Sequence, residues 1–433
     1  MKTSFKKIAR RLLIPAVLSM ICQTASAAEY FLRADTFQKT MPDGAVVTMW
    51  GFALDDDGNF ATEEHAATTP GPVLTVPPGD SMLTIHLYNR LPQLNGADVP
   101  VSIVIPGQMA TLSPVRNPDG RVRSFTHETA RLATGIYEWT GLKPGTYLYQ
   151  SGSHPALEVQ MGLYGAVRKD AAAGEVYPGI SYQQQVVLLY SEIDPAFHQA
   201  VATNNYGPGK AVTSPNLYNP RYFLINGEPN PALKPVALLP GNPGDRLLVR
   251  FLNAGLQAHV PVMLGQYMSL IAEDGNALPY PREQYSVLLP AGKTMDAMIP
   301  TLASGARIPI FDRGLQLTTA TASAATLTTY LAADTDADGV PDYQDNCTLV
   351  KNANQRDTNN DGYGNICDAD FNGNNKVDVA DLNALKAAYN TAVGNPRYNP
   401  DIDLNGDTKI NVIDLNILKS YYLKAPGPSC CGQ

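Results

Sequence analysis

Short apolar alternations separated by turn residues fill the chain from residue 30 to residue 331. The run from Met82 to Asn89 alternates apolar and polar side chains directly after the turn Pro78–Asp80. Runs of this length, bounded by Pro, Gly and Asn, predict the strands of an antiparallel sandwich or barrel. The spacing becomes helical near the C-terminus, at residues 382–389 and 415–422. The pattern therefore predicts a mostly β chain that ends in two short helices.

The same order of turn and strand signals occurs twice within the β region. Gly79-Asp80 followed by Asn89 in the first half corresponds to Gly244-Asp245 followed by Asn253 in the second. This repetition predicts an internal duplication. The expected division is a signal segment at 1–27, β-domains at 28–175 and 176–333, an Asp-rich segment at 334–369, a loop-and-helix module at 370–425 and a flexible Cys-containing tail at 426–433.

The N-terminus predicts export. Basic residues precede an apolar run from Leu12 to Ile21, and Ala25-Ser26-Ala27 is a small-residue cleavage signal, which together indicate a secretory signal peptide. A lipid anchor on Cys22 is the rival interpretation, disfavoured because Met20 and Ile21 are bulky. We therefore expect a secreted protein, extracellular or at the cell surface with the periplasm as an alternative, and no transmembrane segment in the mature chain.

Acidic residues are concentrated in the last hundred positions. The segment from Asp334 to Gln433 holds 15 Asp, no Glu, 6 Lys and 2 Arg, which accounts for −7 of the net charge of −8. Without a basic stripe the chain is not expected to bind nucleic acid. An acidic tail of this kind indicates cations as its ligands.

Four loops in this tail carry oxygen side chains at positions 1, 3, 5, 9 and 12, and a backbone carbonyl is expected to serve at position 7. This is the EF-hand spacing, and hard oxygens are the ligands that calcium takes. The predicted calcium ligands are Asp334, Asp336, Asp338, Val340, Asp342 and Asp345 in the first loop; Asp357, Asn359, Asp361, Tyr363, Asn365 and Asp368 in the second; Asp370, Asn372, Asn374, Lys376, Asp378 and Asp381 in the third; and Asp403, Asn405, Asp407, Lys409, Asn411 and Asp414 in the fourth.

Position 6 of such a loop requires a left-handed backbone. Gly339 and Gly362 meet this requirement in the first two loops, whereas Asn375 and Thr408 stand there in the others. Asn tolerates the left-handed region and Thr tolerates it poorly. We therefore expect the fourth loop to be strained or weaker.

The first two loops, with Cys347 and Cys367 bracketing the second, resemble a thrombospondin type 3 repeat. In an exported protein these two cysteines are expected to form an internal disulfide, and Cys430 and Cys431 are expected to pair with each other or to cross-link to a partner. The last two loops, each followed by a helical pattern, resemble a dockerin.

A dockerin-like module implies a protein partner. The resemblance suggests a cohesin-like receptor, or another copy of this chain, bound through the outward side of the two helices. The residues expected on that side are Asn383, Lys386, Asn416 and Lys419. The simpler alternative is that the two helices only pack on each other.

The β region resembles the cupredoxin domains of multicopper oxidases, above all in the stretch Pro144–Val167. That stretch is expected to form two strands around a loop. Copper-binding members carry His-x-His motifs where this chain has Val101-Ser102-Ile103 and Gln150–His154. The resemblance predicts the fold: mostly β, with two cupredoxin-like Greek-key domains followed by a small calcium-binding module.

The sequence argues against copper chemistry. The region 28–346 contains no Cys, so a blue-copper site cannot form within one chain, and the six His include no His-x-His pair. His154 and His259 are candidate residual copper ligands if they converge, although the simpler interpretation is a hydrogen-bonded imidazole. The other four histidines, His65, His86, His127 and His198, are expected on strands or at the surface.

No nucleophile motif is recognised, and the carboxylates at 55–57 and 63–64 are interpreted as solvated turns. The sequence thus favours a non-catalytic role without deciding the question of catalysis. We expect a secreted calcium-binding scaffold or assembly component that acts through its dockerin-like tail. The alternatives are a divergent multicopper oxidase or a copper-binding protein whose site is completed between subunits.

Overall fold

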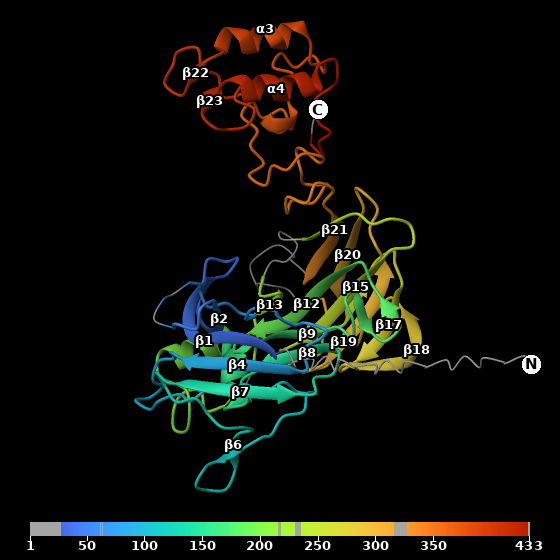
Figure 1. Cartoon of the computed structure of the whole chain (residues 1–433). Helices are drawn as coiled ribbons and strands as arrows, with labels where there is room; N and C mark the ends of the chain where they lie inside the picture. Colours follow the sequence, from blue (N-terminus) through green and yellow to red (C-terminus); the bar gives the residue numbers. More distant parts are fainter. Residues whose placement is uncertain are drawn as a thin grey trace, which may run out of the picture.

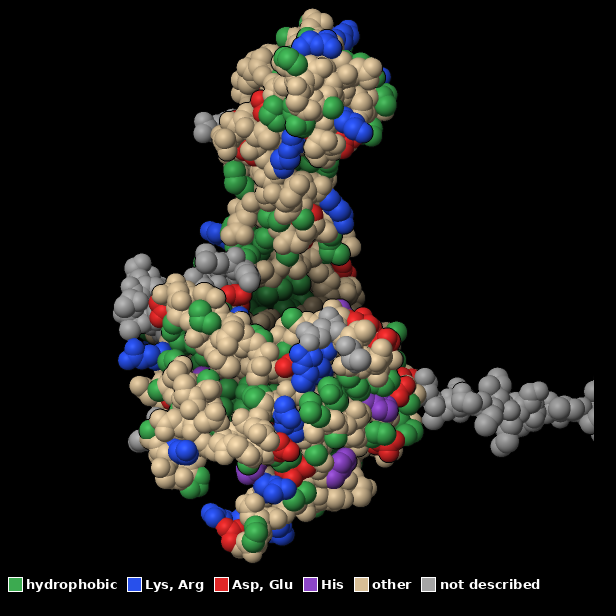
Figure 2. Space-filling view, turned by 90° about the vertical axis from the view of Figure 1, so that its left-hand side faces the viewer, with side chains coloured by type: hydrophobic (Ala, Val, Ile, Leu, Met, Phe, Trp, Pro, Cys, Tyr) green, Lys and Arg blue, Asp and Glu red, His purple; other side chains and the backbone are tan. Residues whose placement is uncertain are grey.

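A computed structural model describes residues 27–431, apart from 61, 63, 215–217, 230–234 and 316–326. The predicted signal peptide, except Ala27, lies outside these residues. Figure 1 shows a body of packed sheets with the helical tail standing apart from it, and Figure 2 shows the narrower neck that joins them. Within the described ranges no helix is both long enough and apolar enough to cross a bilayer.

The first half of the body contains two sheets, and in strand β4 (Met82–Asn89) the core-facing residues alternate as the sequence predicts. In the central strand Leu83, Ile85 and Leu87 are fully buried while their neighbours are half-buried. The strands are β1 (Ala27–Thr40), β2 (Val46–Asp55), β4 (Met82–Asn89) and β7 (Thr134–Thr140) in one sheet, β3 (Leu74–Val76), β8 (Gly145–Gln150) and β9 (Tyr164–Lys169) in the other, and β5 (Val115–Arg116) with β6 (Val122–Ser124) in a separate hairpin.

The second half repeats this plan with longer sheets. Its strands are β12 (Gln184–Ile193), β13 (Tyr222–Ile225), β15 (Arg246–Asn253), β17 (Met268–Glu273), β18 (Asn276–Gln284) and β19 (Thr294–Pro300) in one sheet, β14 (Val236–Leu238), β16 (Pro261–Met263), β20 (Arg307–Asp312) and β21 (Thr328–Ala333) in the other, and the small pair β10 (Glu175–Tyr177) and β11 (Ile180–Ser181). The body is therefore mostly β, with two cupredoxin-like units in sequence.

Strand pairing supports the predicted duplication. Strand β1 pairs antiparallel with β2 and parallel with β4, and β12 pairs in the same way with β13 and β15. The two Asn residues that follow the Gly-Asp turns also play one role. The amide of Asn89 donates to the carbonyls of Val99 and Thr129, and the amide of Asn253 donates to the carbonyls of Gln257 and Leu289.

Two short helices within the body depart from the expectations. The stretch Pro144–Val167 holds β8, α1 (Pro155–Met161) and β9, so a short helix stands where a loop was expected. Pro155 lies in the first turn of α1, a position that suits proline because the backbone N–H there has no partner within the helix. Helix α2 (Pro195–Ala202) belongs by sequence to the second unit, yet its Phe197 and Val201 are buried in the core of the first. The two units are thereby interlocked.

The tail is built from loops around two short helices (Figure 1). Its elements are the 3₁₀ turn η3 (Asn365–Cys367), α3 (Val379–Ala388), α4 (Val412–Tyr421) and the short strands β22 (Thr391–Ala392) and β23 (Lys409–Ile410). Leu385 and Leu418 are fully buried in a small core between the helices. The two predicted helices are confirmed, and they pack on each other.

Candidate functional site

The first residue of each tail loop organises the backbone that follows it. In three loops the position-1 carboxylate accepts the N–H of position 6: Asp334 from Gly339 at 3.0 Å, Asp357 from Gly362 at 3.0 Å and Asp403 from Thr408 at 2.9 Å. In the third loop Asp370 accepts instead from the N–H of position 7, Lys376, at 3.1 Å. These bonds curl the start of each loop around the carboxylate of position 1.

Position 6 adopts the expected left-handed backbone in every loop. The φ angles are 94° at Gly339, 92° at Gly362, 65° at Asn375 and 72° at Thr408. Only glycine occupies this region without a steric cost, and a β-branched residue is least suited to it. The strain that the sequence predicts at Thr408 is therefore present in the backbone.

The first loop gathers carboxylates that hydrogen bonds alone do not satisfy. One oxygen from each of Asp334, Asp336 and Asp338 lies within 4.8 Å of the others. Buried oxygens of Asp336 (Oδ2) and Asp345 (Oδ2) have no hydrogen-bond partner in the described part of the chain. Burial, together with the neighbouring carboxylates, raises the pKa of Asp336 to about 6. An all-oxygen set with unpartnered buried oxygens fits Ca²⁺, whose charge would offset this repulsion.

Asp342, a predicted ligand of this loop, accepts hydrogen bonds both from the loop and from the β body. Asp342 accepts from the Thr335 N–H at 2.6 Å and from the Gly305 N–H at 2.8 Å. Gly305 lies in the turn before β20, so Asp342 fastens the first loop to the body.

The second loop is closed by a disulfide. Cys347 and Cys367 are bonded, as predicted, and both are buried. Inside the loop Asn359 and Asp361 each accept an N–H two residues further on, which holds their side chains over the loop. Asp368 ends the loop, and burial raises its pKa to about 7. Such a carboxylate is costly to ionise unless a cation accompanies it.

In the third and fourth loops, positions 9 and 12 also begin the following helix. Asp378 and Asn411 are the N-caps of α3 and α4, and Asp381 and Asp414 accept the N-cap N–H at 2.8 Å in return. Each pair is a reciprocal capping box, which satisfies N–H groups that a helix start leaves free. The predicted cation ligands at positions 9 and 12 and the residues that cap the two helices are therefore the same side chains.

The predicted position-7 residues, Val340, Tyr363, Lys376 and Lys409, each donate their backbone N–H to a loop aspartate. This bond fixes the peptide that joins positions 6 and 7, next to the position-7 carbonyl that is the predicted ligand.

At the expected copper positions the first unit holds hydroxyl groups. The Oγ atoms of Ser102, Ser124 and Ser153 lie 3.1 Å from one another in a buried cluster, and Ser151 Oγ donates to Glu158 at 2.6 Å. The three hydroxyl groups thus satisfy one another, while Oε1 of Glu158 is buried without a hydrogen-bond partner among the described residues.

The two candidate copper histidines have different surroundings. His154 lines a cavity of about 430 Å³ with Leu94, Val99 and Tyr206, and burial lowers its pKa. His259 is enclosed by two carboxylates: its Nδ1 donates to Asp312 at 2.5 Å and its Nε2 to Glu192 at 2.8 Å. Among the described residues, no group of three or more side chains that is close enough to hold a metal ion includes a histidine. The sequence did not reveal Glu192 or Asp312, which follow no motif and meet His259 only in the fold.

Two expectations about surface residues are wrong. His198 is buried on α2, where its ring bonds to the carbonyls of Thr48 and Gln160, because α2 inserts into the first unit. Asp55 is 2 % exposed and not a solvated turn residue, because it is the last residue of β2 and faces inward.

The sides of α3 and α4 that point away from their shared core carry matched residues. Asn383 and Lys386 on α3 and Asn416 and Lys419 on α4 are all exposed, as expected. The C-terminal segment, expected as a flexible tail, lies against the end of the first loop, with the Cys430 N–H bonded to the carbonyl of Asp345. Cys430 and Cys431 pair with each other.

Comparisons with known proteins agree with this architecture. Residues 190–331 match the family model for multicopper oxidase, residues 332–355 that for the thrombospondin type 3 repeat and residues 368–423 that for the dockerin type I domain. No curated protein matches the sequence.

Solved structures of copper proteins resemble a large part of the chain. A blue copper oxidase from Nitrosomonas europaea aligns with a TM-score of 0.55 at 18% identity, over 71% of this chain and 86% of its own. A copper nitrite reductase from the same organism aligns with a TM-score of 0.51 at 18% identity, over 73% and 97%. At this identity the likeness shows the fold only. The chain is thus a body with the multicopper oxidase fold that continues into segments matching a thrombospondin type 3 repeat and a dockerin type I domain.

Proposed function

We propose that this protein is an exported assembly component, in which calcium braces the tail and the dockerin-like helices attach the β body to a protein partner. The observation that carries the proposal is the shared use of four side chains, Asp378, Asp381, Asn411 and Asp414, as helix caps and as predicted cation ligands. Bound calcium would supply positive charge to clustered carboxylates. The tail core is too small to hold these loops together unaided.

The proposed docking surface is the outward side of α3 and α4. Equivalent positions of the two helices carry the same residue types, with Val379 and Val412 exposed by 58% and 53% beside the Asn and Lys pairs. Apolar residues flanked by amide and ammonium donors suit a protein surface that offers carbonyls and carboxylates. A cohesin-type receptor is the expected partner, and association between copies of this chain is the alternative.

Binding to an immobilised cohesin-type module tests the proposal. The double variant Lys386→Glu/Lys419→Glu is expected to weaken binding at least about tenfold, because it reverses both exposed charges of the surface. Lys210→Glu, an exposed charge on the body, is the matched control. Calcium-dependent binding that the control retains supports the proposal. Absence of binding together with calcium-dependent dimers in sedimentation would favour self-association, and absence of both would contradict the docking role.

The alternative of copper chemistry has a direct test of its own. The serine cluster and the engaged nitrogens of His259 support a body without stoichiometric copper. After purification with added copper, metal analysis is expected to find less than one copper per chain. Stoichiometric copper with an absorption band of a copper thiolate would overturn this and favour an oxidase.

A further inference from the structure

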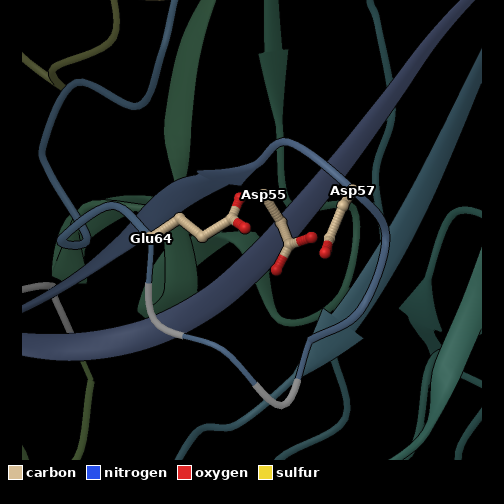
Figure 3. Close-up of side chains that lie close together, drawn as sticks. All are labelled: Asp55, Asp57 and Glu64. Atoms are coloured by element: carbon tan, nitrogen blue, oxygen red, sulfur yellow. The ribbon is translucent and has the colours of Figure 1, made fainter.

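Three carboxylates meet at the end of β2, far from the tail in sequence. Asp55 is the last residue of the strand, Asp57 lies in the turn that follows, and Glu64 lies on the segment that returns along it. One oxygen of each lies within 4.8 Å of the other two. Figure 3 shows the carboxylate of Asp55 between those of Asp57 and Glu64.

Asp55 is buried without a hydrogen-bond partner. Its residue is 2 % exposed, and neither Oδ1 nor Oδ2 accepts a hydrogen bond from any described residue. An unpaired carboxylate in such a place is strongly unfavourable unless a cation or a proton neutralises it.

The nearest basic side chains are engaged elsewhere. Arg33 bonds through Nε to Asp35 at 3.3 Å and through its terminal nitrogen to the carbonyl of His65 at 2.9 Å. His65 Nε2 lies 2.9 Å from Asp56 Oδ2, on the outer side of the turn. Within the described ranges, no Lys, Arg or His side chain therefore bonds to the three carboxylates.

The loop around the cluster is shaped by bonds that leave oxygens facing its centre. Asp57 Oδ1 accepts the Asn59 N–H at 2.7 Å, and Glu64 Oε2 accepts the Asp56 N–H at 2.8 Å. Phe60 stacks on Tyr88 of β4 with ring centroids 5.2 Å apart, which holds the turn against the sheet. Asp57 and Glu64 keep their second oxygens, and both residues are exposed enough to admit water.

We propose that Asp55, Asp57 and Glu64 bind a calcium ion in the β body, at a site separate from the tail loops. Three carboxylates on one side, with water completing the shell, suit the large and irregular coordination of Ca²⁺ better than the strict octahedron of Mg²⁺. Asp55, Asp57 and Asn59 also repeat the alternate spacing of the first three ligands in each tail loop. The ion joins the end of β2 to the returning segment at Glu64.

Hydrogen exchange of the full chain tests this site apart from the tail. With calcium at about ten times the dissociation constant, amides between residues 55 and 65 are expected to exchange about tenfold more slowly than in chelator. Asp55→Asn removes this protection, and Glu64→Gln reduces it. Asp56→Asn is the matched control, because it makes the same charge change in the same turn while its side chain faces His65.

Calcium counting gives a second readout. Equilibrium dialysis is expected to find one calcium fewer per chain in Asp55→Asn than in Asp56→Asn, while the tail loops show equal calcium protection in both variants, which also reports that both are folded. Asp55→Asn is expected to fold, since it replaces an unpaired buried carboxylate by a neutral group of the same shape. Equal calcium counts, or no calcium effect between residues 55 and 65 in the unaltered chain, would overturn the assignment; neither result bears on the docking proposal.

Discussion

Thr408 shows how a single residue can weaken a cation loop. Its φ of 72° places a β-branched side chain in the left-handed region, where an L-residue is about 1–2 kcal/mol less stable. Thr408→Gly is expected to stabilise the calcium-loaded tail by about 0.5–1 kcal/mol, because the added freedom of glycine in the unfolded chain offsets part of the relief. Thermal unfolding in calcium measures the change. Asn375→Gly is the control, and an equal gain there would contradict the argument, since Asn tolerates this backbone better.

His259 predicts how the second unit responds to pH. Burial alone would lower its pKa, but the hydrogen bonds and charges of Asp312 and Glu192 raise it to about 9. The folded state therefore holds the proton more tightly than the unfolded chain, whose histidine titrates near 6.5. This stabilisation is complete below pH 6.5 and is lost as the pH rises to 9, at a cost of about 3 kcal/mol.

Chemical denaturation between pH 6 and pH 9.5 measures this loss. Glu192→Gln removes one of the two carboxylates that raise the pKa of His259, so its decline in stability, which still begins near pH 6.5, is expected to be smaller and to end at a lower pH. A profile that is flat from pH 6.5 to 9 in the unaltered protein would show that His259 does not carry the proton.

At the scale of elements, the proposed calcium binding would be linked to helix stability through the capping boxes. Without a cation, the buried carboxyl groups of Asp381 and Asp414 at the first turns of α3 and α4 would rely on their hydrogen bonds alone. We expect a chelator to loosen both helices, seen as faster amide exchange at 379–388 and 412–421, while the strands of the body keep their protection. Equal loosening of body and tail would contradict a brace confined to the tail.

The sequence predicts elements well where one local pattern decides them. Alternation of apolar and polar residues predicts strands such as β4. The spacing of the ligand positions predicts where α3 and α4 begin, because the residues that cap these helices are part of the loops. Helix α1 is missed because seven residues carry too little periodicity. The burial of Asp55 and His198 is missed because it depends on contacts between different chain segments. Arg33 binds the carbonyls of Thr62 and His65 in the segment that follows Asp55, and α2 packs on β2 around His198.

At the scale of the whole molecule, a buried polar network joins the two units. Arg250 is fully buried and bonds to Asp170 at 2.7 Å and to Thr146 at 2.9 Å, and Thr146 in turn donates to Asp296 at 2.5 Å. Thr146 belongs to β8 of the first unit, whereas Arg250 and Asp296 belong to β15 and β19 of the second. With α2 inserted across the same boundary, the units are expected to unfold together.

Arg250→Met tests this coupling. It leaves Asp170 and Asp296 without their cation, so we expect a loss of about 3–5 kcal/mol and a single unfolding transition of the body at lower temperature. Lys293→Met, which removes two partly exposed ion pairs, with Glu273 and Asp274, is the control and is expected to cost less than about 2 kcal/mol. Separate transitions for the two units in calorimetry would contradict the coupling.

The C-terminal segment connects the end of the tail back to its beginning, so the helices are held to the neck by two lengths of chain. After α4 the chain runs back to the neck, where the N–H of Gly427 bonds to the carbonyl of Cys367 and the N–H of Cys430 to that of Asp345. Tension applied to the helices by a bound receptor therefore reaches the neck along two lines, the loops that precede α3 and the segment that follows α4. A tail held along two lines resists extension more than a single chain does, so the body would be kept at a set distance from the proposed receptor.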